Sequence, residues 1–178
     1  MKHPKVKTLE QAYRFVKRAK ICLIFADERA GIIPLWEVVD LPDRRKGEGG
    51  WGQRVSAIWR WKNELPADYP DEIFYGKIAG GKAALMTLDY LKTELYPQAH
   101  VPVAKCSLLA QTAFEFIRIE PRTTAELRAE VLKGERTRRA AFAKALIELQ
   151  VTLNITRSND PEIETDTWLS FKEQYPQF

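Results

Sequence analysis

The fold is decided by the stretch from Cys106 to Phe171, which reads CSLLAQTAFEFIRIEPRTTAELRAEVLKGERTRRAAFAKALIELQVTLNITRSNDPEIETDTWLSF. Its first part, residues 107–119, repeats apolar side chains at helical spacing, and Pro121 follows. Apolar residues at this period form one face of a helix, and a proline after the run ends it. The stretch therefore opens with a predicted helix over residues 107–119.

A second helix is predicted directly after this proline. Thr123 and Glu126 stand three residues apart, as the two members of a capping box do at a helix amino end. The apolar pattern then runs to Leu132, and Gly134 suits the left-handed conformation in which many helices end. Two helices joined by a short turn are thus expected between residues 107 and 132.

The third helix is predicted over residues 136–150. Its core stripe is spaced i, i+3, i+4 and i+7 and consists of Phe142, Ala145, Leu146 and Leu149. Two segments rich in β-forming residues follow, at 151–156 and 167–171, and a polar loop separates them at residues 157–166. Three helices followed by a β-hairpin predict a winged helix-turn-helix.

Residues 1–104 predict a mixed α/β region. Helices are expected at 9–20 and 88–95, and strands at 21–25, 73–78 and 83–86; Pro66 and Pro70 are expected to break the chain, and residues 96–105 to form a linker. The predicted class is α+β, with an N-terminal region at 1–104 and a winged-helix domain at 105–178.

The charge of the chain is unevenly distributed. Of a net charge of +4, residues 105–150 carry nine Lys/Arg against six Asp/Glu, whereas residues 151–178 carry two against five. The loop between the last two strands holds Asp160, Glu162, Glu164 and Asp166, which would repel a phosphate backbone. Any DNA contact is therefore expected on the helices and on the N-terminal region.

The amino end of the third helix supplies the candidate DNA contacts. With the core stripe facing inward, the residues expected to face outward or flank that face are Arg136, Thr137, Arg138, Arg139 and Lys144. This end enters the major groove in helix-turn-helix proteins, where arginine binds guanine edges or phosphates. The alternative is a charged helix face that contacts only water.

A second basic patch is predicted in and after a stretch rich in tryptophan. Its basic members are Arg54, Arg60, Lys62, Lys77 and Lys82, and Trp51, Trp59 and Trp61 stand among them. Such tryptophans can stack on unpaired bases. The alternative is that they fill the core, as large aromatic side chains do in small domains.

Several other chemistries lack the residues that they need. Two cysteines and two histidines form no metal-binding cluster, so we expect no metal and no cofactor. Gly80, Gly81 and Lys82 lack the rest of a phosphate-binding loop and predict a hairpin turn.

Cys106 precedes a helix, where a thiolate is favoured, with His100 as the nearest candidate partner. No apolar run is long enough to span a bilayer. The two cysteines indicate no disulfide framework, so a protein of the reducing cytoplasm is expected.

Four sequence strings resemble one known family. DERAG at residues 27–31, LWEVV at 35–39, WRWKNELP at 59–66 and YGK at 75–77, with the closing winged helix, are similar to proteins related to the AlkZ-type alkylpurine DNA glycosylases. The resemblance covers residues 26–178 and implies a winged-helix DNA-binding protein. The glycosylases of that family use two glutamines separated by one residue, and no two glutamines of this chain have that spacing.

Three functions remain open from the sequence. The first is a non-catalytic protein that binds double-stranded DNA, in repair or in regulation of transcription. The second is a reduced glycosylase, for which the candidate catalytic carboxylates are Asp27, Glu28, Glu37 and Glu64. The third is a module that binds another protein or a second copy of the chain.

Overall fold

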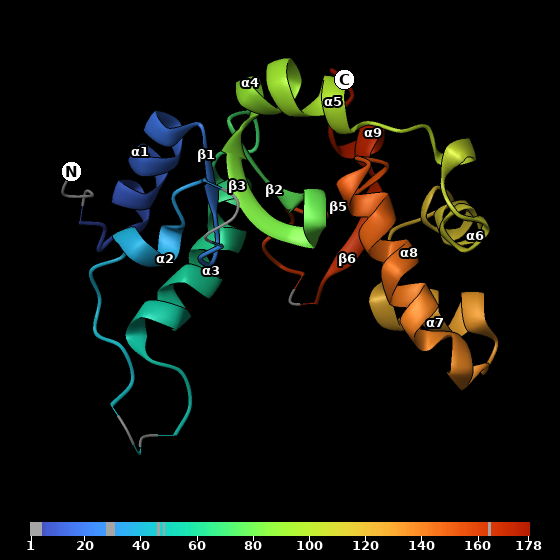
Figure 1. The fold of residues 1–178 in the computed structure, drawn as a ribbon, viewed down its shortest axis with the longest axis horizontal. Coiled ribbons are helices and arrows are strands. Elements are labelled where there is room, and N and C mark those ends of the chain that lie inside the picture. Colours follow the sequence, from blue (N-terminus) through green and yellow to red (C-terminus); the bar gives the residue numbers. More distant parts are fainter. Residues whose placement is uncertain (1–4, 28–30, 46, 48, 164) are drawn as a thin grey trace. The chain divides into compact units, whose positions relative to one another are not determined.

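The computed structural model describes residues 5–27, 31–45, 47, 49–163 and 165–178. It confirms the predicted α+β class, with helices and small antiparallel sheets (Figure 1). The chain divides into two compact units. Unit 1 comprises the residues up to Tyr75 and Lys82–Leu91, and unit 2 comprises Gly76–Gly81 and Lys92–Phe178. The predicted domain boundary after residue 104 stays a prediction.

Unit 1 combines helices with a three-stranded sheet whose strand order is β1-β3-β2. Its elements are α1 (Leu9–Ala19), β1 (Ile21–Leu23), α2 (Leu35–Val38), α3 (Gln53–Asp68), the first half of β2 (Ile73–Ile78), β3 (Lys82–Thr87) and α4 (Leu88–Tyr90). The strands β1 and β3 are antiparallel, and Cys22 lies opposite Leu85. Helix α1 begins as predicted, because the Thr8 hydroxyl accepts a hydrogen bond from the Gln11 amide.

Helix α3 runs through a proline. The prediction that Pro66 breaks the chain was wrong, since α3 continues to Asp68. A proline inside a helix removes one backbone hydrogen bond. Pro66 is buried in the last turn of α3, close to the fully buried Leu65, and the Tyr69 amide still donates to the Leu65 carbonyl. Packing in the core offsets the missing bond.

Unit 2 holds three longer helices and a second three-stranded sheet (Figure 1). Its elements after the π-helical turn η2 (Leu91–Leu95) are α5 (Tyr96–Ala99), η3 (Val103–Lys105), α6 (Leu108–Ile117), β4 (Arg122–Thr123), α7 (Thr124–Leu132), η4 (Arg136–Arg138), α8 (Arg139–Val151), β5 (Ile155–Arg157), β6 (Thr167–Ser170) and α9 (Phe171–Gln174). The sheet order is β4-β6-β5, and both pairings are antiparallel.

The three longer helices of unit 2, α6, α7 and α8, form where the caps and the apolar periodicity predicted them. Thr123 and Glu126 make the complete capping box of α7. The whole predicted stripe of α8 is buried, from Phe142 to Leu149, and packs with residues of α6, α7 and the sheet in one core. Lys133 as well as Gly134 has a positive φ, so the chain leaves α7 through two left-handed residues.

Three segments of unit 2 differ from their predicted structure. Val151 ends α8, and β5 begins only at Ile155, because the chain turns at Leu153 with φ 54°. Residues 96–105, predicted as a linker, hold the short helices α5 and η3. Phe171, predicted in a strand, begins α9 and is fully buried. The strand β4, which was not predicted, is only two residues long.

Candidate nucleic-acid interface

The segment that precedes α8 leaves its basic side chains in water. Arg136, Thr137, Arg138 and Arg139 are all exposed, and Lys144 one turn further along α8 is exposed too. The burial of the opposite face of α8 fixes this orientation, because Phe142 and Leu149 anchor the helix in the core. The amino end of α8 therefore stands free, as the sequence predicted.

A pocket of about 330 Å³ opens between α7 and this segment. Its lining residues are Ala125, Arg128, Ala129, Leu132, Gly134, Glu135, Arg136 and Arg139. Arg128 of α7 is exposed and belongs to this group, although the sequence analysis did not select it. Arg128 lies one turn after Thr124 and four residues before Leu132. The sequence feature that could have identified it is this position on the outer face of the capped helix.

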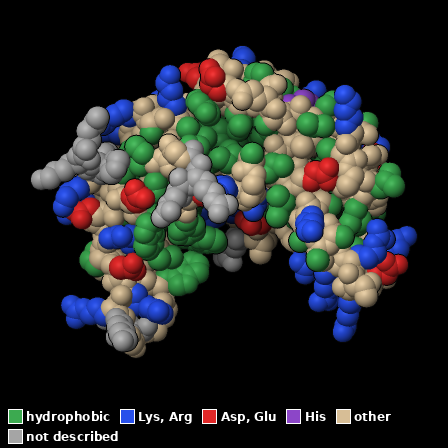
Figure 2. Space-filling model, viewed as in Figure 1, with side chains coloured by type: hydrophobic (Ala, Val, Ile, Leu, Met, Phe, Trp, Pro, Cys, Tyr) green, Lys and Arg blue, Asp and Glu red, His purple; other side chains and the backbone are tan. Residues whose placement is uncertain are grey.

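The charge of this pocket is positive. Three arginines line it with one carboxylate, that of Glu135. Glu135 faces the Arg138 guanidinium at 3.5 Å, and both side chains are more than half exposed. An exposed pair of this kind is weak, because water and salt screen it. Figure 2 shows Lys and Arg side chains gathered over the end of unit 2 that α7 and the start of α8 form.

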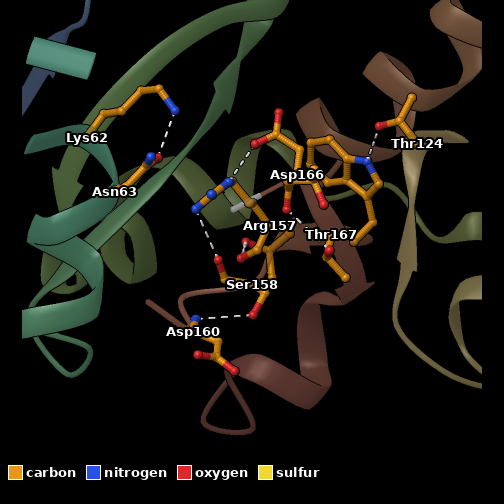
Figure 3. Close-up of polar contacts among 11 residues, drawn as sticks. Lys62, Asn63, Thr124, Arg157, Ser158, Asp160, Asp166 and Thr167 are labelled. Carbon is orange, nitrogen blue, oxygen red and sulfur yellow. Dashed lines mark hydrogen bonds and ion pairs between the residues drawn. The ribbon is translucent and has the colours of Figure 1, made fainter. Parts of the chain in front are cut away.

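The residues of the predicted second patch have separate surroundings. Arg54 is half-buried, lies 5.0 Å from the Trp36 ring centroid and donates to the Leu41 carbonyl. Arg60 is exposed and pairs with Glu64 at 3.4 Å. Lys62 is 4% exposed, and its ammonium donates to Asn63 at 2.7 Å (Figure 3). A phosphate contact by Lys62 would require its side chain to move.

The last two basic candidates hold structural contacts. The Lys77 ammonium donates to the Gly81 carbonyl at 3.4 Å, inside unit 2. Lys82 forms an ion pair with Asp27, inside unit 1. Gly80 and Gly81 have φ of 78° and 73°, so this segment is the turn that the sequence predicted.

A comparison with protein families gives one result. The model of the AlkZ-related family matches residues 6–166. The chain belongs to the AlkZ-related family. This membership confirms the resemblance that the four sequence strings indicated. Searches of the curated proteins and of the solved structures gave no match.

Two of the carboxylates of this AlkZ-related protein that were considered for catalysis form ion pairs. Asp27 is bound by Lys82, and Glu64 by Arg60. Glu37 is exposed on α2, and Glu28 lies outside the described residues. The spaced glutamine pair of the AlkZ-type glycosylases is absent from the sequence.

The tryptophans differ from one another in exposure. Trp61 is 1% exposed and belongs to the core of unit 1, so here the core interpretation is confirmed. Trp51 and Trp59 are 62% and 45% exposed. They differ because Trp61 lies on the face of α3 with the buried Ile58 and Leu65, whereas Trp59 lies on the other face.

Cys106 and His100, the remaining sequence candidates, each contact Thr152. Burial raises the pKa of the Cys106 thiol, so the helix start does not produce a thiolate. His100 contacts the Thr152 carbonyl through Nδ1 at 3.1 Å.

Among the described residues no group of three His, Cys, Asp or Glu side chains could hold a metal ion. No helix within those residues combines the length and the apolar character that crossing a membrane requires.

Proposed function

We propose that unit 2 is a winged-helix module that binds double-stranded DNA. The helices α6, α7 and α8, the short strand β4 and the β5–β6 hairpin follow each other in the order of that motif. The antiparallel sheet β4-β6-β5 has the pairing that the motif requires. In this arrangement η4 and the start of α8 face the major groove, and the loop at residues 158–166 is the wing.

The exposed arginines around the pocket are the observation that carries this proposal. Arg128 comes from α7, whereas Arg136 and Arg139 come from η4 and the start of α8, so arginines of separate elements line one pocket. Arginine binds phosphate oxygens through two parallel hydrogen bonds, which makes such a cluster suited to a DNA backbone. Arg138 and Lys144 extend the same exposed face toward base edges or further phosphates.

The wing is built so that it adds little positive charge. Arg157, only 8% exposed, donates to Asp166 at 2.6 Å and to the Ser158 carbonyl at 3.2 Å (Figure 3). Its charge is used inside the hairpin to hold the two ends of the loop. DNA affinity in this proposal comes from the helices, and the protein acts by binding without a catalytic step.

The test is a charge reversal at the α8 end. Binding of a fluorescent 20-base-pair duplex is measured by anisotropy for the wild type and for Arg136→Glu/Arg139→Glu. Removal of each arginine is expected to weaken binding by roughly 5- to 100-fold, and the salt dependence of log Kd should fall by about 0.9 for each phosphate no longer bound.

A matched control is Lys92→Glu/Lys172→Glu. This variant changes the net charge equally, at two exposed lysines of unit 2 outside the α7–α8 end. We expect it to keep duplex affinity within a few-fold of the wild type. Equal decreases in affinity for both variants would show that only net charge matters, and would contradict a specific interface at Arg136 and Arg139.

A further inference from the structure

Two exposed tryptophans of unit 1 form a pair that the proposed duplex binding does not use. The rings of Trp51 and Trp59 lie 5.4 Å apart between centroids, with an angle of 67° between their planes. Both side chains are largely in water, at 62% and 45% exposure. Large apolar groups rarely remain exposed side by side unless they meet a ligand or a partner. The pair is here named the indole platform.

A buried cation holds one ring of the platform, that of Trp59, in its orientation. Trp59 lies on α3, and the ammonium of the buried Lys62 lies 4.4 Å from the centroid of its ring. Asn63 accepts a hydrogen bond from the same ammonium at 2.7 Å and fixes its position. A cation on one face of an indole ring attracts it and restricts its rotation. Trp59 is therefore oriented before any ligand arrives.

A basic loop is fastened beside Trp51. The Arg44 guanidinium donates to the Gly50 carbonyl at 3.1 Å, and Gly52 approaches the Arg44 backbone so closely that a Cβ there would lie 2.3 Å from its nitrogen. Arg54 holds the start of the loop through the Leu41 carbonyl. These contacts hold Arg44 against Gly50 and Gly52, the two neighbours of Trp51 in the sequence.

The charge around the platform is positive. The described residues between 41 and 64 include five Lys/Arg and two Asp/Glu. On the face shown in Figure 2, hydrophobic side chains gather over α3, and Lys and Arg side chains lie on the loop before it. Arg60, next to Trp59, pairs with the exposed carboxylate of Glu64 at 3.4 Å, which a phosphate group can replace.

We infer that the indole platform binds unpaired bases of single-stranded DNA. Bases stack on the exposed part of the indole pair, and Arg44 and Arg60 neutralise neighbouring phosphates. Exposed aromatic rings beside cations suit a single strand, because its bases stack on rings and its phosphates bind cations. The excess of positive charge around the pair favours a polyanion as the occupant. Stacking is tolerant of base identity, which gives binding without sequence preference.

The experiment compares two probes and two variants. A fluorescent 20-nucleotide oligo-dT and a 20-base-pair duplex are titrated with wild type, with Trp51→Ala/Trp59→Ala and with Arg136→Glu/Arg139→Glu. The tryptophan variant should bind the single strand roughly 10-fold or more weakly and the duplex as the wild type does. The arginine variant should show the opposite selectivity, so that failure of the duplex proposal is separable from failure of this one.

Two further measurements complete the test. Leu108→Ala/Ile119→Ala removes two apolar side chains that are 81% and 72% exposed in unit 2, and it should leave single-strand binding unchanged. Arg44→Ala/Arg60→Ala should reduce the salt dependence of log Kd by about 0.7 for each phosphate that these arginines no longer neutralise. Unchanged oligo-dT affinity in the tryptophan variant would overturn the inference. So would concentration-dependent self-association of the wild type that the tryptophan variant abolishes while neither binds oligo-dT.

Discussion

Glu72 shows how single side chains join separate parts of unit 1. Its carboxylate accepts hydrogen bonds from the Lys17 ammonium at 2.6 Å and from the Tyr13 hydroxyl at 2.8 Å. Both donors lie on α1, and Glu72 lies just before β2. These two hydrogen bonds, that of Lys17 first, hold the pKa of Glu72 below its ordinary value of 4.5. The ionised form is therefore the one that the fold favours.

The lowered pKa of Glu72 predicts a pH-dependent effect of Glu72→Gln. A carboxyl group with a lowered folded-state pKa stabilises the fold above pH 4.5, and this contribution disappears as the pH falls through the lowered pKa. The substitution should therefore lower the urea midpoint at pH 7, and by less at pH 3, which lies below the ordinary pKa. Asp71→Asn, at the exposed neighbouring carboxylate, is the control. The same decrease at both pH values would show that the charged contacts are not the cause.

Arg128 and Cys22 also owe their properties to neighbours that come from other elements. Arg128 belongs to the pocket because Arg136 and Arg139, from later elements, line the same pocket. Cys22 is buried in β1, and its burial raises the pKa of its thiol to about 12. A thiol of this kind is inert at neutral pH. Neither property could be assigned from the residues that flank Arg128 or Cys22 in the sequence.

The elements of unit 2 form where local signals are strong. The capping box of α7 and the stripe of α8 each use residues within seven positions of one another. The strand β4 has no such signal, since two residues cannot show alternation. It exists because Arg122 and Thr123 pair with Trp168 and Thr167 of β6, more than forty positions away.

The start of α3 predicts different effects for two glycine substitutions. Gly52→Ala would place a Cβ 2.3 Å from the Arg44 nitrogen, whereas a Cβ at Gly49 meets nothing within 4 Å. Forcing atoms into a packed contact costs roughly 1–3 kcal/mol of unfolding free energy. We expect this decrease for Gly52→Ala in urea denaturation, and a much smaller change for Gly49→Ala. Equal stability of the two variants would contradict the close packing of the loop on Gly52.

At the scale of the whole molecule, charge is arranged so that each unit has a basic surface and the closing segment is acidic. Residues 105–150 carry the excess of Lys/Arg in unit 2, and residues 151–178 reverse it. If the α8 end binds DNA as proposed, the negative charges of the acidic loop repel the DNA phosphates. Charge of one sign in such a loop limits affinity and reduces binding to incorrect sites.

This arrangement predicts that removing acid from the loop strengthens duplex binding. Asp160→Asn/Glu162→Gln removes two negative charges, and the introduced asparagine keeps an oxygen that can accept the hydrogen bond now donated by the backbone amide of Glu162 to Asp160 at 2.9 Å. We expect Kd for the duplex to fall by roughly 2- to 10-fold in low salt and to approach that of the wild type as salt is raised. Glu94→Gln/Glu173→Gln makes the same change in charge at exposed sites elsewhere in unit 2. A larger gain in this control than in the loop variant would place the repulsion outside the loop.

The sequence alone determined α6, α7 and α8 of unit 2, the buried stripe of α8, the exposure of Arg136–Arg139 and the family. Caps and periodicity act between residues a few positions apart, so one segment is enough to reveal them. Only the tertiary structure decided that Lys62 and Trp61 are buried, that Trp51 and Trp59 stand in water, and that Arg128 joins the pocket. Exposure and convergence depend on which distant segments pack together, and no single segment contains that information.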